Sequence, residues 1–252
     1  MNHGSAVLFL AGNGHDPVRL EPVRAVLERE ERFELVVLEY ASVETFDALL
    51  ESLESQTRRI ASKHDIRLVY ATGIGALVAL ALRARGSLQD WPLVLQGGVL
   101  WGLEQRWFPR IMRIGPMPRL LAFAFGNKLI RARFAAKHLN SERSPEFLER
   151  FFEGYRDARA FENWFRWLTP ALLRHLEQKL IGNPPALANI QAWWGEHDHV
   201  VGPEELRVTE RALNFEFQLR RFAGWGHYPM IDDPEGWTRE VSDVLEKAGA
   251  LS

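Results

Sequence analysis

The 252-residue sequence contains no cysteine, which excludes disulfides, thiol catalysis and thiolate metal sites. It also lacks any run of about 18 apolar residues, so it predicts no transmembrane helix. The first residues, Met-Asn-His-Gly-Ser, show no basic region followed by an apolar run. We therefore expect no signal peptide, and the cytoplasm is the default localisation.

Signatures of several binding classes are missing as well. Gly12-x-Gly14 lacks the third glycine of a dinucleotide fingerprint, and no Gly-Lys-Ser/Thr phosphate loop occurs. His197 and His199 alternate along the chain, and no third residue at metal-binding spacing accompanies them. The chain carries a net charge of −2 and no recognised nucleic-acid module. We expect no metal, no cofactor and no nucleic-acid partner.

The charge is unevenly distributed. Residues 103–182 hold fifteen Lys and Arg against eight Asp and Glu, and residues 106–137 hold eight basic residues and no acidic one. Such a segment can attract anionic ligands or surfaces. The commoner reason for such a pattern is a solvated helix face, or an insert that packs on an acidic core.

Apolar strands alternate with amphipathic helices along most of the chain. This alternation predicts an α/β fold with a mostly parallel sheet of about six strands and helices on both faces. The expected strands are residues 6–10, 33–38, 66–70, 91–96, 190–194 and 215–222. The chain closes with a predicted helix over residues 237–247.

One long section interrupts the alternation. Residues 101–182 contain no convincing strand but several helical patterns rich in Phe and Trp. We interpret residues 1–100 and 183–252 as a core and 101–182 as an inserted helical cap. Its aromatic side chains are expected to form core packing and the wall of an apolar chamber, with Trp101 as a candidate substrate contact.

A glycine occupies the turn where chemistry is expected. Residues 66–80 predict a buried strand, a sharp turn of small residues and an apolar helix, with Gly73 between the small residues Ala71 and Gly75. Two later loops also follow strands, where ligand sites of open α/β sheets lie. They are Gly195-Glu-His-Asp198-His-Val-Val201 and Gly224-Trp-Gly-His227-Tyr-Pro229, the latter followed by Asp233-Pro-Glu235.

In this order, over nearly its whole length, the chain resembles the α/β-hydrolase superfamily. There the first turn is the nucleophile elbow, followed along the chain by the acid and the histidine. The resemblance implies that Asp198 orients His227, the general base. It further implies oxyanion-binding amides at Ile74 and, in the loop of Gly12, at Asn13. His15 is a further candidate for the pocket.

The resemblance also implies a nucleophile, which Gly73 cannot supply. Shifting the elbow by one residue to Thr72 would put bulky Tyr70 and Ile74 at the flanking positions that must be small. Gly73 therefore holds the nucleophile position. Glycine would also relieve the backbone strain typical of such an elbow.

Three hypotheses remain open from the sequence. The protein is an enzyme that uses Asp198 and His227 without a covalent intermediate, a ligand-binding pseudo-hydrolase, or an engineered Ser-to-Gly variant of a serine esterase. The presence of both Asp198 and His227 favours an enzyme, because an idle pair would be free to change. The expected partner is a small molecule, apolar or anionic, and a homo-oligomer is left open.

Overall fold

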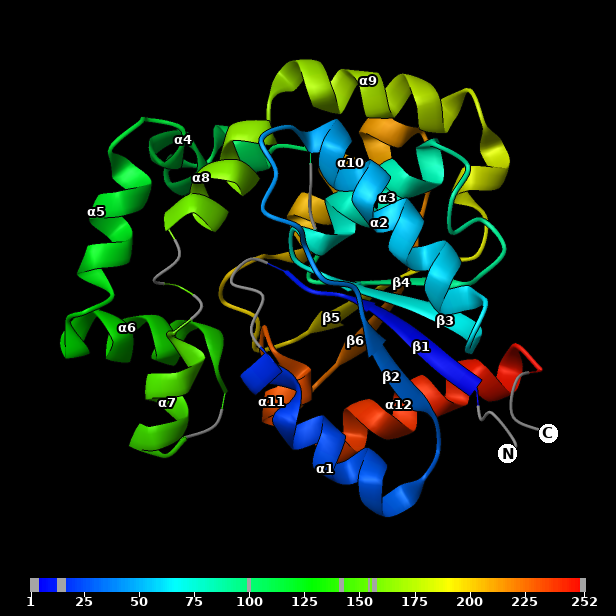
Figure 1. Ribbon diagram of the computed structural model, residues 1–252, viewed down its shortest axis with the longest axis horizontal. Helices are drawn as coiled ribbons and strands as arrows, with labels where there is room; N and C mark the ends of the chain where they lie inside the picture. Colours follow the sequence, from blue (N-terminus) through cyan, green and yellow to red (C-terminus); the bar gives the residue numbers. More distant parts are fainter. Residues whose placement is uncertain are drawn as a thin grey trace.

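The computed structural model describes residues 5–12, 17–98, 101–140, 143–153, 155 and 158–249. Within these residues, six strands form one parallel sheet in the order β2-β1-β3-β4-β5-β6 (Figure 1). The strands are β1 (Ser5–Leu10), β2 (Glu34–Val37), β3 (Asp65–Thr72), β4 (Leu93–Gln96), β5 (Ile190–Gly195) and β6 (Gln218–Phe222). The prediction of a mostly parallel sheet of about six strands is confirmed.

The central strands are buried on both faces, as their continuous apolar sequences predict. Every residue of β1 and β4 is buried. Tyr70 of β3 packs edge-on against Trp193 of β5 and Trp237, with ring centroids 5.7 and 5.1 Å apart. This aromatic cluster fills the interior beneath the middle of the sheet.

Helices cover the two faces of the sheet (Figure 1). One face carries α1 (Glu21–Glu30), α11 (Pro229–Asp232) and α12 (Pro234–Lys247), and α1 packs on α12. The other carries α2 (Phe46–Ala61), α3 (Gly75–Ala84), α9 (Pro170–Ile181) and α10 (Pro203–Leu213), and α9 packs on α3. The sheet thus lies between two helical layers, as predicted.

Between β4 and β5 the described chain is helical. Before α9 come α4 (Trp107–Met112), α5 (Met117–Ala124), α6 (Lys128–His138), α7 (Pro145–Phe151) and α8 (Ala158–Trp167). Both α4 and α5 pack on α8, and these helices lie to one side of the sheet (Figure 1). The division of the chain into a core and a cap at residues 101–182 stays a prediction. Among the described helices, none has the length and apolarity needed to cross a membrane.

The largest differences from the predicted boundaries are at the starts of β6 and α12. Strand β6 begins at Gln218 rather than Phe215, because Glu210 of α10 accepts the backbone N–H groups of Phe215 and Phe217. Helix α12 begins at Pro234 rather than Trp237. Asp233 caps it by accepting the Gly236 N–H at 3.0 Å, and proline suits the first helical position.

Candidate active site

The turn between β3 and α3 has the geometry that its small residues predict. Gly73 has a φ of +49°, in the left-handed region that favours glycine. A Cβ on Gly75 would lie 2.5 Å from the carbonyl oxygen of Leu10 and 2.6 Å from that of Ala11. Helix α3 can therefore start so close to β1 only with glycine at position 75.

The hydroxyl of Thr72 is engaged elsewhere. Thr72 is buried, and its Oγ1 accepts the backbone N–H of Gly12 at 2.9 Å. By contrast, a Cβ on Gly73 would meet, within 4 Å, Gly12 Cα alone among the described residues, at 3.7 Å. The space beside the turn thus adjoins position 73, while the Thr72 hydroxyl serves the backbone of the loop after β1.

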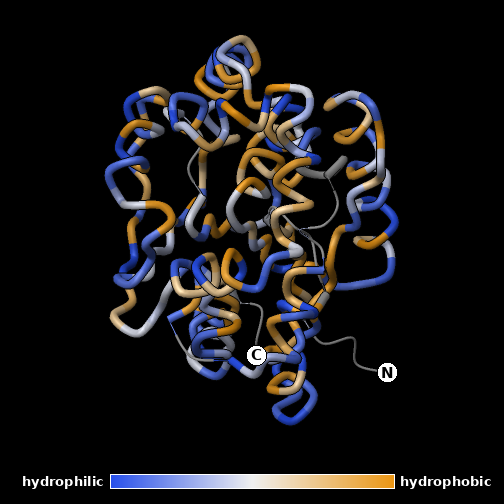
Figure 2. Tube along the Cα trace, turned by 90° about the vertical axis from the view of Figure 1, so that its left-hand side faces the viewer, coloured by the Kyte–Doolittle hydropathy of each residue, from blue (hydrophilic) through white to orange (hydrophobic). Residues whose placement is uncertain are grey.

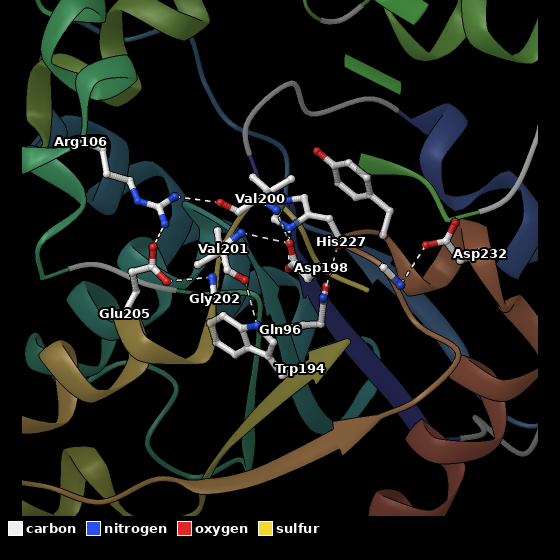
Figure 3. A network of polar contacts seen from close by, with 12 residues as sticks. Gln96, Arg106, Trp194, Asp198, Val200, Val201, Gly202, Glu205, His227 and Asp232 are labelled. Atoms are coloured by element: carbon white, nitrogen blue, oxygen red, sulfur yellow. Dashed lines mark hydrogen bonds and ion pairs between the residues drawn. The ribbon is translucent and has the colours of Figure 1, made fainter. Parts of the chain in front are cut away.

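Asp198 and His227 lie together at the carboxyl end of the sheet (Figure 3). His227 Nδ1 is 2.8 Å from Asp198 Oδ2. The other oxygen, Oδ1, accepts the backbone N–H groups of Val200 and Val201 at 2.8 and 3.0 Å. The Asp198 side chain is only 1 % exposed and that of His227 is 11 % exposed. One carboxylate therefore shapes its own turn and holds the histidine.

These contacts keep Asp198 ionised. Burial alone would raise the pKa of its carboxyl group, but the charge and hydrogen bond of His227, together with the amides of Val201 and Val200, hold it below its ordinary value. An ionised Asp198 accepts the Nδ1–H of His227. That tautomer leaves Nε2 of the imidazole as the basic nitrogen.

The end of β4 joins this pair to Gly73. The carbonyl oxygen of Gln96 accepts the N–H of Gly73 at 3.2 Å, and its side-chain Nε2 donates to the carbonyl oxygen of His227 at 3.2 Å. A Cβ on the next residue, Gly97, would lie 3.3 Å from Asp198 Oδ2 and 3.4 Å from His227 Cε1. The turn and the Asp198–His227 pair therefore flank the same strand end.

The loop of Asp198 is clamped by a residue of the helical section. Arg106 donates to the carbonyl oxygen of Val200 at 2.8 Å and forms an ion pair with Glu205 of α10. Glu205 in turn accepts the N–H of Gly202 at 2.7 Å (Figure 3). The acid loop is therefore fixed from α10 and from the segment before α4.

The loop of His227 is held in a similar way. Asp232 of α11 accepts the N–H of Gly226 at 3.1 Å and that of Asn140 at 2.9 Å. The Asn140 side chain also donates to the carbonyl oxygen of Gly224 at 3.3 Å. Arg106 and Asn140, which both lie between β4 and β5, thus contact the two loops that carry the pair.

A second imidazole lies against the first. The rings of His138 and His227 meet edge to face with centroids 5.5 Å apart, and His138 Nδ1 lies 2.7 Å from the carbonyl oxygen of Phe134. Burial lowers the pKa of His138 well below its ordinary value, and the charges of protonated His227 and of Arg19 lower it further. His138 is therefore a neutral neighbour of the base.

A cavity of about 120 Å³ lies beside Gly12 and Thr72. Its walls are mostly apolar, and Arg19, which is only 6 % exposed, is its buried cation. The guanidinium carbon of Arg19 is 4.9 Å from each of three ring centroids, those of Phe151, Tyr155 and Tyr228. Exposed Arg24 and Glu39 line the same cavity.

The remaining candidates have different outcomes. Gly12 lines the cavity, and Ile74 is the residue preceding the first turn of α3. Asn13 and His15 lie outside the described residues. Trp101 is buried and does not line the cavity beside Gly12. The roles of all these residues stay predictions.

Sequence reasoning did not find Gln96, His138 or Arg19. Only Gln96 had a usable signal, since it ends a strand immediately before Gly97-Gly98. The contacts of the other two depend on how distant helices pack. In the part of the chain that the structure describes, no group of three His, Asp or Glu residues is placed to hold a metal ion.

Comparisons with known proteins agree with this architecture. Residues 3–240 match the model described as "Alpha/beta hydrolase family". No curated protein sequence matches the chain. Among solved structures, similar ones include a thermophilic esterase from Thermogutta terrifontis, with 18% identity and a TM-score of 0.64 over 97% of this chain and 90% of that one. A haloalkane dehalogenase variant from Bradyrhizobium elkanii has 15% identity and a TM-score of 0.67, covering 99% and 91%. MenH from S. aureus has 13% identity and a TM-score of 0.66, covering 99% and 96%. At these identities the structural likeness concerns the fold.

Proposed function

The chain belongs to the alpha/beta hydrolase family, and on that premise we propose that it is a small-molecule enzyme in which His227 acts as a general base without a covalent serine intermediate. The observation that carries this proposal is the 2.8 Å contact between His227 Nδ1 and the buried Asp198 Oδ2. A carboxylate in this position fixes the tautomer of the imidazole. It also stabilises the imidazolium that forms when the base takes a proton.

Hydrolysis by water is the reaction that this arrangement supports best. Apart from its two chain neighbours, no residue that the structure describes places a side-chain atom within 4 Å of a Cβ built on Gly73, and the nearest atom is Gly12 Cα. A water molecule there loses a proton to His227 Nε2 while its oxygen bonds to the carbonyl carbon of an ester. The imidazolium then returns the proton to the departing alkoxide, and Asp198 stays ionised throughout.

The oxyanion of that step needs hydrogen-bond donors. Ile74 immediately precedes α3, so its amide belongs to the helix terminus, where N–H groups lack helical partners and the helix dipole is positive. We assign it to the oxyanion, and the resemblance implies the Asn13 amide as a second donor. One donor of this kind contributes about 10²–10³ in kcat in a serine protease.

The cavity suggests the class of substrate. Its volume of about 120 Å³ corresponds to roughly four water molecules. The apolar walls favour a short hydrocarbon group, and the buried guanidinium of Arg19 favours a carboxylate at its end. The proposed substrate is therefore a small ester with an acidic acyl part, such as a monoester of a short dicarboxylic acid.

The test compares the parent with His227→Asn and His227→Ala. Asparagine keeps a donor for Asp198 at the position of Nδ1 but has no basic nitrogen. Hydrolysis of p-nitrophenyl monoesters of short dicarboxylic acids, measured across pH, should fall in both variants by about 10²–10⁴, the usual contribution of general-base catalysis. Parent activity that both variants retain in full would overturn the proposal.

A ligand-binding protein without catalysis is the second candidate, and Gly73 is the observation that favours it. Its prediction is distinct. The parent would bind short dicarboxylates in calorimetry, with unchanged affinity in His227→Asn, but would hydrolyse none of the esters above the rate of His227→Ala.

A further inference from the structure

Large apolar side chains are exposed along the segment that contains helices α4, α5 and α6. Trp107 is 72%, Phe123 85% and Leu129 74% exposed. Ile114, Leu120 and Ile130 of the same segment are exposed as well. In the rest of the described chain, Ile181 and Leu219 are the exposed large hydrophobic residues. Concentration of such residues in one segment marks an interaction surface.

The same segment exposes cations and contains no acidic residue from Arg106 to Lys137. Arg106 and Arg131 form ion pairs with Glu205 and Glu149. The other six are exposed, namely Arg110, Arg113, Arg119, Lys128, Arg133 and Lys137. Six exposed cations thus accompany six exposed hydrophobic side chains. We call these twelve residues the cationic apolar face.

The packing of the helices explains why this face is free. The inner sides of α4 and α5 pack on α8, and the buried residues of the segment, among them Met112, Pro118 and Phe125, point inward. In Figure 1 these helices lie at the side of the molecule away from the sheet. Figure 2 views the molecule from that side, where hydrophobic and hydrophilic stretches alternate along the trace.

We propose that the cationic apolar face docks on the surface of an anionic lipid bilayer. Trp, Phe and Leu side chains accompanied by Lys and Arg are the composition of segments that lie in a membrane interface, with the apolar groups entering the acyl boundary and the cations meeting lipid phosphates. A second copy of the chain is a poorer occupant. A symmetric dimer through this face would bring two sets of six cations together, with no acidic residue in the segment to offset them.

The chemistry of the face sets the size of the expected effects. Each Lys or Arg near an anionic membrane surface raises binding about fivefold. Replacing two of them, as in Arg119→Gln with Lys128→Gln, should therefore weaken binding about 25-fold. The remaining attraction should weaken further as salt is added, because the surface potential decays within a Debye length.

The experiment measures co-sedimentation of the full chain with phosphatidylcholine vesicles, with and without phosphatidylserine. We expect binding only when phosphatidylserine is present. The pair Trp107→Ser with Phe123→Ser should lose it, whereas the matched pair Ile181→Ser with Leu219→Ser, at exposed apolar positions elsewhere, should bind like the parent. Unchanged melting temperatures establish that each variant is folded.

A direct measure of insertion uses the absence of cysteine. A single environment-sensitive fluorophore on Phe123→Cys should shift to the blue on anionic vesicles, and the same label on Ile181→Cys should not. Three results would overturn the proposal. They are no binding of the parent, an equal effect of both serine pairs, and a parent dimer that the Trp107→Ser and Phe123→Ser pair converts to monomer.

Discussion

Restoring a hydroxyl at position 73 is the most demanding test of the site. The structural effect of Gly73→Ser can be estimated first. The backbone φ of +49° is unfavourable for a residue with a side chain, by roughly 1–2 kcal/mol. Within the described part of the chain no steric clash adds to it, because the new Cβ would lie 3.7 Å from Gly12 Cα, an ordinary van der Waals distance. For a chain of this size, that strain lowers the melting temperature by about 2–8 °C.

The catalytic effect should have the opposite sign. A serine at position 73 would stand across the end of β4 from His227, which can take the hydroxyl proton during attack on an ester. We expect hydrolysis of p-nitrophenyl acetate to rise at least about 10²-fold, the lower end of what general-base activation contributes. A burst of p-nitrophenol and an acetyl adduct on residue 73, seen by mass spectrometry, would identify the acyl-enzyme.

Gly73→Ala is the matched control, since it introduces the same backbone strain without a hydroxyl. Its melting temperature should equal that of Gly73→Ser, and it should hydrolyse the ester no faster than the parent. Adding His227→Ala to Gly73→Ser should remove the burst. A folded Gly73→Ser variant with the melting temperature of Gly73→Ala but with neither a burst nor an adduct would contradict this argument. Position 73 would then not face the base, and the assignment of the elbow would be wrong.

Three further predictions concern neighbouring groups. Asp198→Asn should lower kcat for the parent reaction by up to about 10⁴ while leaving KM nearly unchanged, because the amide holds the wrong tautomer of His227; an equal loss in kcat and binding would contradict this. Arg19→Leu should raise KM for monoesters of dicarboxylic acids but not for neutral esters of the same length, and a rise for both would mean that Arg19 only supports the cavity wall. His138 is neutral in the folded protein, so below a pH of about 6.5 the unfolded chain binds a proton that the folded chain does not. As the pH is lowered further, the free energy of unfolding should decrease by up to about 1.4 kcal/mol for each pH unit. Denaturant titrations of His138→Gln between pH 6.5 and 5 should show a free energy of unfolding that depends less on pH by this amount. An equal pH dependence in the parent and the variant would refute the argument.

Much of the scaffold could be predicted from the sequence because its signals are local. Continuous apolar runs specify buried parallel strands, and the carboxyl ends of such strands meet at one edge of the sheet. The order of the three loops was therefore enough to bring Gly73, Asp198 and His227 to the same region. The positive φ of Gly73 and the close approach at Gly75 follow from the same small-residue pattern.

The surroundings of the pair could not be predicted in this way. His138 meets His227, and Arg106 reaches the acid loop, only because the helices after β4 dock where they do. No periodicity encodes such contacts, since the partners lie about 90 residues away in the sequence. Arg19 likewise meets its three aromatic rings through tertiary packing.

In the sequence, the presence of both Asp198 and His227 favours an enzyme. The structure weakens this argument, because it shows a second reason for the two residues to be present. Asp198 both caps a turn, through Oδ1, and contacts His227, through Oδ2. Truncating His227 would leave an ionised, buried carboxylate without its hydrogen-bond donor, and such an unsatisfied buried group costs about 1–3 kcal/mol or more. Stability alone therefore gives a reason to keep His227 when no serine needs it.

The two ring nitrogens of His227 allow its effect on stability to be tested apart from its proposed effect on catalysis. The interaction with Asp198 uses Nδ1, whereas the proposed proton transfer uses Nε2. His227→Asn supplies a donor to Asp198 and removes the base, so it should lose activity while losing far less stability than His227→Ala. A chain whose His227 serves only to hold Asp198 would instead show equal function in the parent and the asparagine variant. The comparison of these two substitutions thus decides whether a base still works beside the glycine.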